Sequence, residues 1–193
     1  MKVISGTLKG RNIEGYNIDG TRPTMDRVKE SLFGMIQDYI KDSIVLDLFA
    51  GSGQLGIEAI SNGSKLCYFI DNNNEVIKTL NNNITNLKIK DNSKIILSDW
   101  KKFLNSSSEK NIKFDLIFVD PPYDYDVYEK ILDKVSTLNL LNNNGLIILE
   151  HHNLKLKDKY NNLALYKQKK YGNKSVNIYK MNWHIFFLMI YFT

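Results

Sequence analysis

The sequence has 193 residues, of which 43% are hydrophobic and 24% are charged, the composition of a globular domain with a full core. Its single cysteine excludes an intrachain disulfide framework and is typical of a protein from a reducing compartment. The net charge of +5 lies in the C-terminal part, where residues 155–180 include eight lysines and one acid. This basic segment favours a polyanionic partner, while the three asparagine triplets leave a bias in composition as the alternative explanation.

The first 24 residues predict a small N-terminal β-hairpin or arm, because glycines punctuate the stretch "VISGTLKGRNIEG". The start of the chain lacks the apolar run of a signal peptide and the Arg- and Ser-rich character of a transit peptide. A helix is expected after the arm, with Thr24 as its N-cap and Asp26 in its first turn. Its apolar face would consist of Val28, Leu32, Phe33, Ile36 and Ile40.

Short apolar runs alternate with helical patterns through the middle of the chain. Five of these runs predict strands, over residues 43–49, 65–71, 93–99, 114–120 and 145–151. Helices are predicted between them, over residues 53–63, 75–87 and 127–141. Strands that alternate with helices form βαβ units, so the sequence predicts a parallel sheet that is covered by helices on both faces.

The pattern changes after His151, where "NLALYKQKKYGNKSVNIYKM" predicts two strands around a tight turn at Gly172 and Asn173. We therefore expect an α/β fold with one seven-stranded, mostly parallel sheet that ends in an antiparallel hairpin strand. The expected single domain covers residues 1–181, with the arm at residues 1–24. The apolar tail, residues 182–193, is shorter than the roughly 20 residues that a membrane-spanning helix needs, and the sequence assigns it no role.

The stretch "DLFAGSGQLG" places Gly51 and Gly53 between a predicted strand and a predicted helix, a spacing that several nucleotide-binding folds share. Acids at the ends of three successive strands narrow the choice of ligand. Asp47 suits an ammonium group, Asp71 suits two ribose hydroxyls, and Asp99 suits the amine of adenine. S-adenosylmethionine carries these three groups and no phosphate, and is therefore the predicted cofactor. The predicted cofactor site also includes three sequence neighbours of these residues, Phe49, Asn72 and Trp100.

The stretch "FVDPPYDY" ends the fourth predicted strand, at the edge of the sheet where the carboxyl ends of parallel strands form a ligand crevice. Its two prolines lack N–H donors, so the Asp120 carboxylate and the Pro121 carbonyl remain as acceptors. Two acceptors can hold the hydrogens of an exocyclic amine, and Tyr123 can stack on a base that is splayed out of its helix. The predicted catalytic residues for N-methylation of a base are Asp120, Pro121, Pro122 and Tyr123.

Four stretches together resemble the bacterial 16S rRNA guanine-N2 methyltransferases of the RsmD type: "VISGTLKGR", "TRPTMDRVKESLF", "LDLFAGSGQLGIEAISNG" and "FDLIFVDPPY". The resemblance implies a class I methyltransferase (Rossmann-like) fold and S-adenosylmethionine as methyl donor. It also implies N2 of one guanine in 16S rRNA, free or in an assembling small ribosomal subunit, as the target. We expect a cytoplasmic monomer with no membrane partner. No metal is expected, because three histidines and one cysteine supply no ligand set.

Eight basic residues are candidates for contacts with RNA phosphates, with ordinary solvated charge as the alternative for each. If the strand before the terminal turn runs parallel to the main sheet, this turn opens on the catalytic side and its four lysines border the RNA path. The eight candidates are Lys9, Arg11, Arg22, Arg27, Lys167, Lys169, Lys170 and Lys174.

Three other functions are weighed against guanine-N2 methylation. The D-P-P-Y motif is shared with DNA adenine methyltransferases, so adenine-N6 methylation of DNA or RNA is the nearest alternative. A catalytically inactive RNA-binding protein of the same fold is a second, which the intact motif disfavours. A NAD-dependent oxidoreductase is a third, and Asp47 disfavours it because a carboxylate is a poor neighbour for a pyrophosphate.

Overall fold

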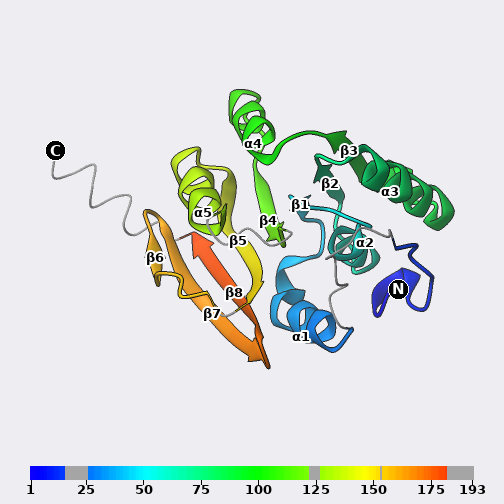
Figure 1. The fold of residues 1–193 in the computed structure, drawn as a ribbon, viewed down its shortest axis with the longest axis horizontal. Coiled ribbons are helices and arrows are strands. Elements are labelled where there is room, and N and C mark those ends of the chain that lie inside the picture. Colours follow the sequence, from blue (N-terminus) through cyan, green and yellow to red (C-terminus); the bar gives the residue numbers. More distant parts are fainter. Residues whose placement is uncertain (16–25, 122–126, 153, 182–193) are drawn as a thin grey trace, which may run out of the picture.

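The computed structural model of the protein describes residues 1–15, 26–121, 127–152 and 154–181. Arg22, Thr24, Pro122 and Tyr123, for which the sequence predicts specific roles, lie outside the described residues. In the described part, a single sheet carries helices on both of its faces, as the sequence predicts (Figure 1).

Within the described residues, the sheet has eight strands in the order β3-β2-β1-β4-β5-β8-β7-β6. The strands from β3 to β5 pair in parallel, whereas β8 runs antiparallel to both of its neighbours, β5 and β7. The seven predicted strands are present, and the eighth, β6, has only two residues. The strands are β1 (Ile44–Asp47), β2 (Leu66–Asp71), β3 (Ser93–Leu97), β4 (Phe114–Val119), β5 (Leu141–His152), β6 (Lys159–Tyr160), β7 (Leu163–Tyr171) and β8 (Lys174–Met181).

The order of the strands reverses direction between β1 and β4. From β1 the chain adds β2 and β3 on one side, and it then crosses to add β4 and β5 on the other. In an open parallel sheet, such a switch point leaves a crevice outside the carboxyl ends of the two central strands. The carboxyl ends of β1 and β4 are where the sequence places Asp47 and Asp120.

Two buried clusters fill the space between the sheet and its helices. α1, α2 and α3 contribute to the cluster on one face, and α4 and α5 contribute to the cluster on the other. Figure 1 shows α4 and α5 on the opposite side of the sheet from α1 and α2. The helices are α1 (Asp26–Ile36), α2 (Gln54–Ser61), α3 (Asn74–Leu87), α4 (Trp100–Glu109) and α5 (Val127–Thr137), with single 3-10 turns η1 (Gly6–Leu8), η2 (Gln37–Tyr39) and η3 (Lys90–Asn92).

The helix predicted over residues 127–141 is too long at its C-terminal end. Asn139 adopts a left-handed conformation (φ 51°), and the Leu140 N–H donates to the Val135 carbonyl at 3.1 Å. This is the pattern of a helix that closes with a left-handed residue, so α5 ends at Thr137 and Leu141 begins β5. α4 is a helix that the sequence analysis did not predict.

The N-terminal arm folds back on itself and packs against α2. A single antiparallel bridge joins Lys2 to Asn12, and η1 forms the turn between them. The arm is therefore a loop closed by one bridge, a minimal form of the hairpin that the sequence predicts. Its start is held by Glu58 of α2, whose carboxylate accepts from the N–H groups of Ile4 and Ser5.

None of the helices in the described ranges is long and apolar enough to span a membrane.

Candidate active site at the carboxyl edge of the sheet

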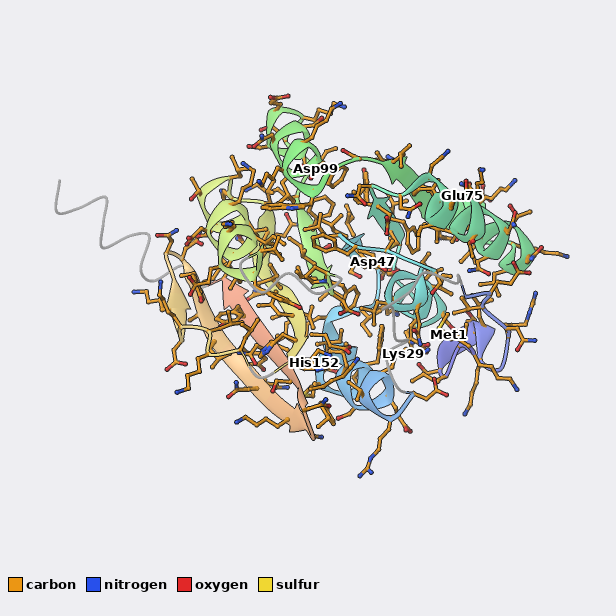
Figure 2. All side chains as sticks on the ribbon, viewed as in Figure 1. Met1, Lys29, Asp47, Glu75, Asp99 and His152 are labelled. Carbon is orange, nitrogen blue, oxygen red and sulfur yellow. The ribbon has the colours of Figure 1, made fainter. Side chains whose placement is uncertain are left out.

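Acidic residues lie at the carboxyl ends of four neighbouring strands. Asp71 ends β2, Asp47 ends β1, Asp120 directly follows β4, and Glu150 lies near the end of β5. Figure 2 labels Asp47 near the middle of the fold, where β1 meets the loop that leads into α2. Because these strands are parallel, their acids gather at one edge of the sheet, beside the switch point.

The glycine loop between β1 and α2, and the first turn of α2, each donate a backbone N–H group to one of these acids. The Gly51 N–H donates to Asp71 Oδ2 at 3.0 Å, and the Gly56 N–H donates to Asp47 Oδ2 at 2.9 Å. Gly51 and Gly53 both have positive φ, at 55° and 84°, which is the conformation that favours glycine. The loop is therefore shaped by the same acids that the sequence predicts as cofactor ligands.

Packing is a second reason for glycine in the loop and in the first turn of α2. A Cβ atom at Gly53 would lie 2.5 Å from Leu80 Cδ1, and one at Gly56 would lie 2.3 Å from a ring carbon of Phe69. Glycine at these two positions lets α2 approach the sheet and α3 closely. Close approach to a ligand is thus not the only demand on the motif.

Asp47 is buried, with 3% of its surface exposed. Burial raises the pKa of its carboxyl to about 7, while the hydrogen bond from Gly56 acts in the opposite direction and the charge of Asp71 raises it further. A carboxyl group with a pKa near 7 is ionised easily when a cation lies next to it. The site thus favours a positively charged group next to Asp47.

Asp71 has the remaining acceptor capacity that a ribose would need. Its Oδ1 accepts from the Asn73 N–H at 2.9 Å and its Oδ2 accepts from Gly51, and each carboxylate oxygen has a further lone pair. The next residue, Asn72, is exposed, and Phe49 is half-buried against the cluster that contains α4 and α5. These positions are compatible with the predicted cofactor site.

Asp99, which the sequence predicts as an acceptor for the adenine amine, also caps the N-terminus of α4. It lies two residues beyond the end of β3 and is the N-cap of α4, where its Oδ1 accepts from the N–H groups of Lys101 and Lys102 at 2.8 and 3.3 Å. The side chain is exposed, and Figure 2 shows it at the start of α4. Trp100, the first residue of α4, packs half-buried on the same cluster as Phe49.

Asp120 and Pro121 leave β4 at the switch point. Pro121 is buried, and Asp120 is half-buried. Burial raises the pKa of Asp120 to about 8, the negative charges of Glu150 and Asp47 raise it as well, and the charge of Lys174 lowers it. Pro122 and Tyr123, the other two predicted catalytic residues, lie outside the described residues.

An ion pair beside Asp120 escaped the sequence analysis. Lys174, the first residue of β8, pairs with Glu150 of β5, and their side chains are only 13% and 4% exposed. The signal for Glu150 was present, because the apolar run "GLIILE" ends in an acid as the other strands do. The partnership was hidden, because 24 residues separate the two side chains in the chain.

The turn at Gly172 and Asn173 opens at the catalytic edge. β7 runs parallel to β5, since both are antiparallel to β8, and His152 at the end of β5 is in register with Lys174. The strand before the turn therefore runs parallel to the main sheet, as the prediction for the hairpin lysines requires. Lys170 is exposed there, but the other three have partners: Lys167 Nζ donates to the Met35 carbonyl, Lys169 Nζ to Ser31 Oγ, and Lys174 pairs with Glu150.

Three of the basic candidates in the N-terminal part lie at the surface of the described structure. Lys9, Arg11 and Arg27 are exposed, and the Arg11 guanidinium donates to the Asn86 carbonyl at the end of α3. The prediction that they contact RNA stays a prediction. The described residues contain no cluster of three or more His, Cys, Asp or Glu side chains that could hold a metal ion.

Buried Asn83 of α3 joins the arm to the glycine loop. Its amide nitrogen donates to the carbonyls of Glu14 and Ser52, both at 3.0 Å, and its oxygen accepts from the Glu14 N–H at 2.8 Å. This role could not be predicted, because Asn83 belongs to a triplet of asparagines that is typical of compositional bias.

With this geometry established, comparison with known proteins identifies the family. The model of the family described as Conserved hypothetical protein 95 matches residues 1–180. The chain belongs to this family. Among similar proteins, the ribosomal RNA small subunit methyltransferase D of Haemophilus influenzae is 33% identical over 180 residues, 93% of this chain and 93% of that protein. The protein of the same name from Escherichia coli K12 is 35% identical over 145 residues, 75% of this chain and 68% of that protein.

Solved structures similar to this member of the Conserved hypothetical protein 95 family have the same fold. The Escherichia coli protein yhhF matches with a TM-score of 0.84 and 30% identity, over 94% of this chain and 98% of that chain. An RNA methyltransferase from Salinibacter ruber, in complex with S-adenosyl-L-homocysteine, matches with a TM-score of 0.61 and 14% identity, over 83% and 94% of the two chains. The predicted resemblance to the RsmD type and the predicted class I methyltransferase fold are confirmed.

Proposed function

We propose that the chain is an S-adenosylmethionine-dependent methyltransferase that modifies the exocyclic N2 of a guanine in 16S rRNA. Two relatives that are at least 33% identical carry the name ribosomal RNA small subunit methyltransferase D. The observation that carries the proposal is the place of Asp120 and Pro121. They leave β4 at the switch point, beside the β1 end that holds Asp47 and the glycine loop.

The cofactor would be held by the acids at the ends of β1 and β2. Bound S-adenosylmethionine supplies an electrophilic methyl group on a sulfonium. Asp47, near neutrality when no cation is beside it, would become the counter-ion of the ammonium group, and Asp71 would accept from the ribose hydroxyls. Asp99 would accept from the adenine amine, with Phe49, Asn72 and Trp100 around it. The donors of this ligand match the acceptors of the site.

Asp120 and the Pro121 carbonyl would orient the amine of the base. Both are hydrogen-bond acceptors, and two acceptors fit the two hydrogens of an exocyclic nitrogen. The nitrogen would gain the methyl carbon as the bond from that carbon to the sulfonium sulfur breaks, and it would release a proton to water. An ionised Asp120 would hold the amine and offset its developing positive charge. From the sequence, Pro122 would remove a competing N–H donor and Tyr123 would stack on the base.

The partner would be 16S rRNA or the assembling small ribosomal subunit, with the enzyme acting as a cytoplasmic monomer. Of the eight predicted RNA contacts, five are exposed among the described residues and suit phosphate binding best: Lys9, Arg11, Arg27, Lys169 and Lys170. Lys170 lies on the hairpin whose turn opens at the catalytic edge. The RNA would therefore run past this turn toward Asp120.

The proposal is tested with the purified protein, labelled S-adenosylmethionine, and either 16S rRNA or small subunits from a strain that lacks the gene. We expect one N2-methylguanine, located by mass mapping of nuclease fragments. N6-methyladenine would support the alternative substrate, and no transfer to either RNA or subunit would overturn the proposal. The same mapping of rRNA from the deletion strain should find that guanine unmodified until the gene is returned.

Asp120→Ala separates a catalytic role from a structural one. We expect turnover to fall by at least about 10²-fold, because the variant loses an interaction that strengthens as the amine becomes charged. Cofactor affinity, measured by calorimetry, should change little. An equal loss of cofactor binding would contradict the assignment of Asp120 to the amine. Turnover equal to that of wild type would show that methyl transfer does not depend on Asp120, and would refute its catalytic role.

A further inference from the structure

Four charged side chains form a row across the carboxyl edge of the sheet. Val45, Phe118, Ile148 and Val176, on the central strands β1, β4, β5 and β8, all belong to the buried cluster that includes α1, α2 and α3. Side chains two residues apart on a strand share a face. The four residues two positions away therefore face the same side; we call them the charge row, and they are Asp47, Asp120, Glu150 and Lys174.

The pairing of the strands brings the members of the charge row close together. Val119 is in register with Leu149, so the next residues, Asp120 just after β4 and Glu150 within β5, lie side by side. Glu150 and His152 are in register with Val176 and Lys174, which brings Lys174 to the same end of β5. Asp120 is thus followed along the sheet by an acid and then by a lysine.

The Glu150–Lys174 pair is enclosed, as its 4% and 13% exposed side chains indicate. Removing two charges from water costs several kcal/mol per ion, so an enclosed pair is weak support for stability as such. A lysine on a hairpin turn that opens toward RNA would more simply point into solvent. The burial of the Lys174 side chain beside Asp120 therefore needs an explanation other than stability.

The charges that act on Asp120 come from three other strands of the sheet. Glu150 of β5 and Asp47 of β1 disfavour its anion, whereas Lys174 of β8 favours it. Asp71 of β2 lies one strand further and acts on Asp47. α1 packs on this face with Phe33 against the Phe118 ring at 5.8 Å, and its buried cation Lys29 is paired with Glu58.

We propose that Lys174, held in place by Glu150, is a positioning residue that favours ionisation of the Asp120 carboxyl as the amine binds. The inference rests on the proposed function and deepens it. An ionised carboxylate is only an acceptor, whereas a protonated one carries an O–H donor that would face the amine hydrogens. Burial and the charges of Glu150 and Asp47 favour the protonated form of Asp120, whereas the charge of Lys174 favours the ionised form. Lys174 is then part of the methyl-transfer site and not one of the RNA contacts.

The ionisation of Asp120 can be measured without any substrate. Protein labelled with ¹³C at the aspartate carboxyls is titrated by NMR, and the Asp120 signal is identified by its loss in Asp120→Asn. Lys174→Met should raise the pKa of Asp120 by about one unit, because a nearby positive charge is removed. Glu150→Gln should lower it, because an anion is lost and Lys174 is released toward Asp120. Shifts in opposite directions are the signature of the charge row.

The rate of methyl transfer to 16S rRNA should follow the same order. The pH at which the rate falls on the acid side should move up in Lys174→Met, with about a tenfold loss at pH 7, and down in Glu150→Gln. Lys174→Arg, which keeps the charge, should restore the wild-type profile. The double variant Lys174→Met/Glu150→Gln leaves no unpaired buried charge, so it should fold and keep the profile close to that of wild type.

The exposed pair Lys157–Glu129 provides matched controls, since its side chains are 70% and 45% exposed. Lys157→Met and Glu129→Gln should leave the Asp120 signal and the acid limb unchanged. An Asp120 pKa that is the same in Lys174→Met and wild type would overturn the inference, as would a Lys174→Met variant that lost only RNA affinity. If wild type methylates no RNA, the proposed function fails, and the NMR titration still decides whether Lys174 controls Asp120.

Discussion

The buried ion pair between α1 and α2 gives a sharp prediction about stability. Lys29 Nζ lies 3.1 Å from Glu58 Oε2, and both side chains are fully buried. The pair also anchors the arm: Lys29 donates to the Lys2 carbonyl at 2.8 Å, and Glu58 accepts from the Ser5 N–H and hydroxyl, both at 2.7 Å. Figure 2 places Lys29 between α1 and the N-terminal arm that begins at Met1.

Removing one partner of this pair leaves an uncompensated charge in the core, which typically costs about 3–5 kcal/mol. Lys29→Met should lie near the lower end, because Glu58 keeps the hydrogen bonds from Ile4 and Ser5. Glu58→Leu should lie at or above the upper end, because it also leaves those backbone N–H groups without their acceptor. In both variants the arm should detach before the rest of the domain unfolds.

Urea unfolding of the full chain measures the free energies, and hydrogen exchange at the amides of Val3 and Ile13 reports on the arm. These two amides donate to the carbonyls of Arg11 and Met1 and so protect the closed loop. The exposed pair Lys78–Glu75 serves as the control, where Lys78→Met should cost less than about 0.5 kcal/mol. A loss below about 1 kcal/mol in Lys29→Met, with arm exchange unchanged, would refute the reasoning.

Asp47→Asn should make the cofactor-free protein more stable above pH 7 and weaken its binding of S-adenosylmethionine. Because burial raises the pKa of Asp47 to about 7, its contribution to stability is present below pH 4 and is lost as pH rises toward 7 and beyond. Urea unfolding at pH 5 and pH 8, with calorimetry of cofactor binding, checks both effects, and a stability change equal at the two pH values would contradict the explanation. Asn83→Ala should weaken cofactor binding several-fold and lower the free energy of unfolding by about 1–3 kcal/mol. The substitution removes the hydrogen-bond partner of the Glu14 N–H and of the Glu14 and Ser52 carbonyls. Unchanged cofactor affinity in calorimetry would show that Asn83 supports only the arm.

Most strands and helices of the fold could be predicted from local patterns in the sequence. All the strands of the described residues except β6 were predicted from their local patterns, and all the α-helices except α4, because burial against a sheet requires an apolar pattern within one element. α4 was missed because its stretch, "WKKFLNSSSE", is mostly polar and its three serines resemble a loop. The end of α5 was missed because Asn139 closes the helix through a conformation that the apolar pattern does not encode.

The candidate site divides in the same way. Asp47, Asp71 and Asp120 were predicted because an acid that ends a buried run is visible in the sequence, and parallel strands must bring their carboxyl ends to one edge. The tertiary structure alone decided which face these acids share and which cation joins them. Lys174 meets Glu150 only because β8 inserts antiparallel between β5 and β7, a choice of strand order that no local pattern specifies.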